Sequence, residues 1–128
     1  MKTLLALAAV GEAATGVVLL AYPPIVVRLL FGVEIVGTGI VMSRVAGVAL
    51  IALGAACWPG SSPSRALRAM LCYSLSATLY LAYLGIRGEW VGSLLWPAVA
   101  IHAVLTFLLA RAFTVGTKGD PWQRRKKA

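Results

Sequence analysis

The chain has 128 residues, of which 60% are hydrophobic and only 12% are charged, and its formal net charge is +8. Average soluble domains carry about 25% charged residues, and a soluble domain this short has too little interior to bury so much apolar surface. The composition therefore excludes an ordinary soluble domain and indicates one integral membrane domain.

Four long apolar segments predict the architecture. They cover residues 3–22, 37–58, 66–86 and 91–113. Each segment is close to the ~20 residues that a helix needs to cross ~30 Å of hydrocarbon. None alternates polar with apolar residues as a barrel strand would, and a helix satisfies its own backbone groups in lipid. We predict an all-α fold, a four-transmembrane-helix bundle over residues 1–116 followed by a basic tail over residues 117–128.

The loop after the first span has a helical pattern of its own. Pro23 and Pro24 end the first span, and residues 25–31 are apolar except for Arg28. Proline fits the first turn of a helix, and an apolar segment with one basic residue suits the membrane surface. We predict a short interfacial helix here, closed by Gly32.

The distribution of basic residues predicts the orientation. Four spans place both termini on one side. The basic residues of that side are Lys2, Arg65, Arg68, Arg111, Lys118, Arg124, Arg125, Lys126 and Lys127. Only Arg28 and Arg87 belong to the opposite loops. Because cytoplasmic loops are enriched in lysine and arginine, we predict a bacterial cytoplasmic membrane protein with both termini in the cytoplasm.

The last four basic residues form a short run near the end of the chain. Arg124, Arg125, Lys126 and Lys127 are expected to contact anionic lipid. The run has no interleaved aromatic residues and no recognisable binding fold around it. It therefore does not indicate a nucleic-acid partner.

Two opposite charges lie inside the first two apolar segments. Glu12 is in the first segment and Arg44 is in the second. A charge at membrane depth is costly, so it normally faces the protein interior and has a partner. Depths estimated from a rise of ~1.5 Å per residue place both residues in one layer. We predict a buried Glu12–Arg44 ion pair that holds the bundle together.

Other residues are predicted to face the same interior. Gly16, Gly47 and Gly54 lie on the faces that carry these charges, where glycine lets neighbouring helix backbones approach closely. A stripe at i, i+3, i+7 and i+10 in the third segment consists of Tyr73, Ser76, Tyr80 and Tyr83. With His102 of the fourth segment, this stripe is expected to form a polar slab around the ion pair.

The sequence carries no signature of a catalytic, metal or cofactor site. Cys57 and Cys72 are not spaced as a Cys-x-x-Cys pair and are predicted to be small buried residues in the cytoplasmic half. His102 is the one histidine, so a zinc site would lack ligands. No phosphate-binding glycine loop or nucleophile motif is present. We predict no catalytic residue, no metal and no cofactor.

Two motifs resemble those of small bacterial DoxX-like membrane proteins. One is P-x-x-x-R-L-L-F-G at residues 24–32, and the other is R-V-A-G-x-x-L-I-x-L-G at residues 44–54. The resemblance covers the first half of the chain and the four-span layout, and it implies a compact bundle of four helices. Some DoxX-type proteins are associated with quinone-linked sulfur oxidation, but no residue here matches that activity, and fold analogy alone does not carry function.

Three functions remain open from the sequence. The first is a non-enzymatic accessory or scaffold subunit, with a membrane-protein partner or a second copy of the chain. The second is a small proton-linked transporter or ligand-binding bundle using Glu12, Arg44, Tyr80 and His102, although neutralisation of Glu12 by Arg44 would disfavour cation exchange. The third is a quinone- or lipid-linked enzyme with its substrate beside Tyr80 and His102.

Overall fold

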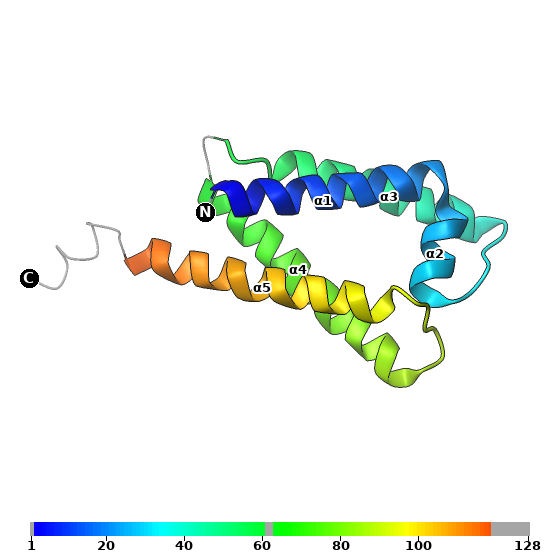
Figure 1. The fold of residues 1–128 in the computed structure, drawn as a ribbon. Coiled ribbons are helices and arrows are strands. Elements are labelled where there is room, and N and C mark those ends of the chain that lie inside the picture. Colours follow the sequence, from blue (N-terminus) through cyan, green and yellow to red (C-terminus); the bar gives the residue numbers. More distant parts are fainter. Residues whose placement is uncertain (1, 61–62, 119–128) are drawn as a thin grey trace, which may run out of the picture.

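The computed structural model describes residues 2–60 and 63–118, and these residues form helices without any strand (Figure 1). The helices are α1 (Lys2–Ala21), α2 (Pro23–Phe31), α3 (Thr38–Ala56), α4 (Pro63–Arg87) and α5 (Leu95–Lys118). All except α2 are long and apolar enough to cross a membrane. The predicted all-α fold, with four such helices and a short helix after the first, is confirmed. Residues 119–128, most of the predicted tail including its last four basic residues, lie outside the described residues.

The helix boundaries follow proline and glycine. α4 begins at Pro63, three residues before the predicted span, because proline suits the first turn of a helix. Gly32 closes α2 in a left-handed conformation with φ 72°, and its N–H donates to the carbonyl of Arg28. Pro23 is the first residue of α2 and is fully buried.

The segment before α5 is bonded to the end of α2. The N–H of Gly92 donates to the carbonyl of Leu30 at 2.9 Å, and the N–H of Leu94 donates to that of Leu29 at 2.8 Å. These carbonyls belong to the last turn of α2, where backbone carbonyls have no hydrogen-bond donor within the helix. This pairing explains why α5 begins at Leu95 rather than at the predicted residue 91.

The four long helices pack as two pairs. α1 packs mainly against α3, and α4 packs mainly against α5 (Figure 1). The pairs meet in an apolar core near the start of α1. The buried residues of this core are Leu5, Ala8, Ala9, Cys57, Ala66, Leu67, Met70 and Leu109. At the other end of the bundle, α2 contacts α1, α3 and α5 and so links the pairs a second time.

Glycine allows the backbones of α1 and α3 to touch. A Cβ atom built on Gly16 would lie 2.6 Å from the carbonyl oxygen of Gly47, and one built on Gly54 would lie 2.5 Å from that of Ala9. Both distances are shorter than real Cβ contacts, so no side chain fits there without a shift of the backbone. The two contacts also fix an antiparallel register, because position 16 is level with 47 and position 9 with 54.

Candidate functional site

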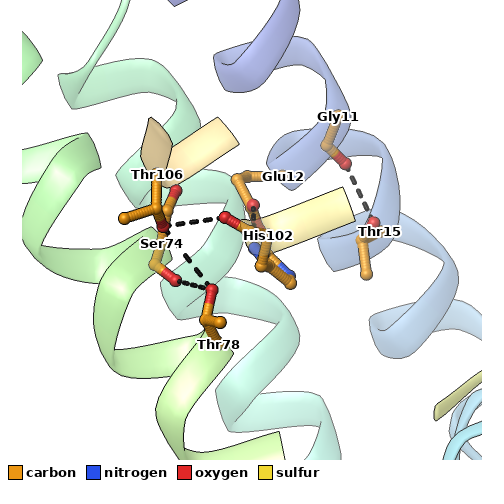
Figure 2. Close-up of polar contacts among 7 residues, drawn as sticks. All are labelled: Gly11, Glu12, Thr15, Ser74, Thr78, His102 and Thr106. Carbon is orange, nitrogen blue, oxygen red and sulfur yellow. Dashed lines mark hydrogen bonds and ion pairs between the residues drawn. The ribbon is translucent and has the colours of Figure 1, made fainter. Parts of the chain in front are cut away.

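A carboxylate and an imidazole meet where the two helix pairs come together. The Oε1 atom of Glu12 on α1 lies 3.9 Å from the Nδ1 atom of His102 on α5 (Figure 2). Their side chains are only 7% and 15% exposed. The separation is within the range of an ion pair but exceeds that of a hydrogen bond. Nδ1 is buried and has no hydrogen-bond partner among the described residues.

Helical spacing places Glu12 on the face of α1 that meets α4 and α5. Leu5, Ala8 and Glu12 follow one another at i, i+3 and i+7, and all three are buried. Ala9 and Gly16 are buried on the neighbouring face, against α3. The carboxylate therefore continues the line of apolar core residues into the middle of the bundle.

Tyr73 adds an aromatic ring from α4. Its ring meets that of His102 edge to face, with the centroids 5.8 Å apart and the planes at 78°. This geometry is favoured for aromatic pairs, because the edge of one ring is positive and the face of the other is negative. Glu12, Tyr73 and His102 form what we call the acid–imidazole site.

Three small hydroxyl residues lie beside this site, Ser74 and Thr78 on α4 and Thr106 on α5 (Figure 2). Thr106 donates to the carbonyl of His102 at 2.7 Å, and Thr78 donates to that of Ser74 at 2.7 Å. The two threonine hydroxyls lie 3.5 Å apart. Ser74 is fully buried, and its Oγ has no hydrogen-bond partner among the described residues. Serine and threonine four residues apart in an apolar helix are the sequence signal that would have identified this cluster.

Arg44 is not part of the site. It is exposed on α3 and forms no ion pair with any described residue, so the predicted Glu12–Arg44 pair is replaced by the contact between Glu12 and His102. The register of α1 and α3 gives the reason. Arg44 is level with position 19 of α1, seven residues or about 10 Å along the bundle from Glu12.

The polar slab is also smaller than predicted. Of the stripe on α4, Tyr73 faces the interior, whereas Ser76, Tyr80 and Tyr83 are exposed. The buried face of α4 passes through Ser74, and each residue turns a helix by about 100°, so Ser76 lies on nearly the opposite side.

The two cysteines are free thiols, whereas the acid–imidazole site can bind protons. Cys57 is buried and Cys72, which was predicted to be buried, is exposed, and both are free thiols. Across residues 2–60 and 63–118, no three His, Cys, Asp or Glu side chains come together as metal ligands. Glu12 and His102, however, can each bind a proton, since a carboxylate and an imidazole each accept one.

Comparisons with known proteins do not assign the chain to a family. No protein-family model matches it, and no curated protein or solved structure is significantly similar. The resemblance to DoxX-like proteins therefore stays a prediction. The function has to be argued from the site itself.

Proposed function

We propose that this chain is a small integral membrane protein that binds a proton at Glu12 and His102 and links its uptake to solute binding or transport. The observation that carries the proposal is the 3.9 Å contact between these two buried side chains, within helices long enough to span a membrane. Ionisable residues inside membrane spans are costly, and they commonly mark ion pathways and proton relays.

The position of Arg44 removes the main argument against proton exchange. A permanent positive charge beside Glu12 would hold the carboxylate in its ionised form. Arg44 lies about 10 Å further along the bundle, and the described basic group beside Glu12 is the imidazole of His102. Unlike arginine, histidine loses and gains its proton near neutral pH.

The site lies between the helix pairs, and this position gives the proton a mechanical effect. Glu12 belongs to the α1–α3 pair, whereas Tyr73 and His102 belong to the α4–α5 pair. An ionised carboxylate attracts an imidazolium, and this attraction is lost when either group is neutral. Because 3.9 Å leaves room for the two atoms to approach to hydrogen-bond distance, proton uptake changes how tightly the pairs close.

The single histidine makes the proton site directly measurable. In a chain labelled with nitrogen-15 only at histidine, every imidazole signal comes from His102. We expect Glu12→Gln to change the pH at which this signal titrates, because the imidazole then loses its charged neighbour. Glu34→Gln, the same change at an exposed residue between α2 and α3, is the matched control and should leave the titration unchanged. Identical titrations in all three proteins would refute the pairing.

Transport is tested separately in proteoliposomes. A pH gradient across the vesicle membrane should drive the movement of at least one solute from a panel of cations, anions and neutral compounds. Glu12→Gln and His102→Asn should abolish this dependence on the gradient, and Glu34→Gln should preserve it. If no solute moves with the gradient, the transport part of the proposal fails, whatever the imidazole titration shows.

A second function, an accessory subunit of a membrane complex, is favoured by one specific observation. Arg44 is exposed although it lies inside a helix that is long and apolar enough to span a membrane. A charge facing the outside of a bundle at that depth is costly, and a counter-charge from another molecule would offset the cost. If this chain is a subunit that binds a larger protein through α3, that protein would supply the counter-charge.

A further inference from the structure

The exposed face of α3 carries a charge among apolar residues. Arg44 is six residues after Thr38, the start of the helix, and is therefore about 9 Å along its axis. Val41, Val45 and Val48 surround it in the helical lattice, and each is more than half exposed. The described part of the chain offers no carboxylate to Arg44. An anionic group from outside the chain would offset the cost of this charge.

Among the described residues, a second copy of the chain has no free carboxylate at the depth of Arg44. The chain has four acidic residues, of which Asp120 lies outside the described residues. Glu12 is buried against His102, and Glu34 and Glu89 lie in loops beyond the helix ends. A two-fold dimer through α3 would moreover place Arg44 close to its own copy, because both partners use the same face.

The same face allows close approach of another helix. Ala52 and Ala55 are exposed and follow Arg44 two and three turns further along the helix, within about 80° of its direction. Small residues let two membrane helices come into backbone contact, and a polar pair across such a contact adds specificity. Arg44 and these alanines thus form one surface, which we call the Arg44 face.

We infer that the Arg44 face binds a transmembrane helix of a different protein, one that carries an aspartate or glutamate at the depth of Arg44. This inference rests on the accessory-subunit function proposed above and names the class of partner. Charge complementarity selects the partner, because a carboxylate is the side chain that neutralises arginine and matches its hydrogen-bond donors.

Photo-crosslinking in native membranes tests this inference. A photoreactive amino acid replaces Val48, one turn from Arg44 on the same face, and in a control chain it replaces Val104, which is exposed on α5. We expect the Val48 probe, and not the Val104 probe, to capture one integral membrane protein of different sequence. Mass spectrometry then identifies the crosslinked helix and its acidic residues.

Charge exchange decides whether the contact is the inferred one. Arg44→Glu should reduce the crosslink yield at least about tenfold, and Arg44→Gln should also reduce it, because a buried carboxylate is left without its partner. Changing the partner's acidic residue to arginine should restore the yield with Arg44→Glu. Val45→Ala, a change without charge on the same face, should leave the yield as it is. An unchanged nitrogen-15 signal from His102 shows that each variant has kept its fold.

The other outcomes overturn the inference in distinguishable ways. A crosslink to a second copy of the chain, or to lipid alone, excludes a different protein as the occupant of the Arg44 face. A crosslinked protein whose yield does not respond to Arg44→Glu leaves the accessory function standing and refutes the ion pair. If neither probe captures any protein, both the inference and the accessory function fail.

Discussion

Replacing Gly54 by alanine tests the backbone contact between α1 and α3. The added Cβ would lie 2.5 Å from the carbonyl oxygen of Ala9 and 3.0 Å from the Cβ of Ala13. Ordinary contacts begin near 3.4 Å, so α1 has to move away by about 0.9 Å, the difference from the shorter distance. The closest obstacle is a backbone atom, which cannot turn aside as a flexible side chain can.

The expected cost follows from two opposing effects. Overpacking of this kind typically costs about 1–3 kcal/mol. Alanine is favoured over glycine within a helix by about 1 kcal/mol, which offsets part of that cost. Gly11→Ala on α1 is the matched control, because nothing lies within 4 Å of its added Cβ. The two variants should therefore differ in stability by about 1–3 kcal/mol, with Gly54→Ala the less stable.

Reversible unfolding in a single detergent, followed by circular dichroism, measures both variants against the native chain. Gly11→Ala should unfold at the same denaturant concentration as the native chain or a higher one, and Gly54→Ala at a lower one. Equal stabilisation by both substitutions would mean that α1 and α3 do not touch at Gly54. The register drawn from that contact, and with it the position assigned to Arg44, would then be refuted.

Three other expectations concern the end of α2, the orientation in the membrane and the partner of Glu12. Gly32→Ala should destabilise the protein by about 1 kcal/mol in the same assay, because Gly32 has φ 72° at the end of α2; unchanged stability would contradict the role of this cap. Glu89→Cys, in a chain whose two native cysteines are replaced by serine, should react with a membrane-impermeant reagent outside intact cells, and labelling only after lysis would reverse the predicted orientation. In double-mutant cycles of thermal stability, Glu12 and His102 should couple by at least about 0.5 kcal/mol, while Glu12 and Arg44 should be additive; coupling of Glu12 to Arg44 alone would restore the sequence-based ion pair.

The sequence predicts the elements of this fold because they depend on local features. Length and composition are enough to identify helices that can span a membrane. The ends of the predicted spans differ from the ends of the observed helices by only a few residues. Pro23 and Gly32 mark the short helix after the first span for reasons of backbone conformation alone. Glu12 and His102 are identified as site candidates because ionisable residues are rare at membrane depth.

The partners of these residues are harder to predict, because they depend on how the helices rotate and slide. A stripe of hydroxyl residues on α4 predicts an inward face through Tyr80 and Tyr83, but the helix instead turns Ser74 and Thr78 toward α5. Apolar residues do not distinguish the two faces in a membrane protein, since both protein and lipid accept them. Polarity alone therefore does not determine which hydroxyl groups become buried.

The position of Arg44 depends on the register between α1 and α3. Side-chain size explains this register better than an alignment of the helix ends does. If Ala21 and Gly37 were level, Arg44 would be level with position 14, within two residues of Glu12, but Gly16 would face Met42 and Gly54 would face Leu4. The observed register moves Arg44 five residues, or about 7.5 Å, further from Glu12. It brings Gly16 against Gly47 and Gly54 against Ala9, so that small residues meet at both of these contacts. Many close backbone contacts outweigh one ion pair whose attraction is largely offset by desolvation. The additivity expected for Glu12 and Arg44 follows from this choice of register, and His102 is then the group that remains at the level of the carboxylate.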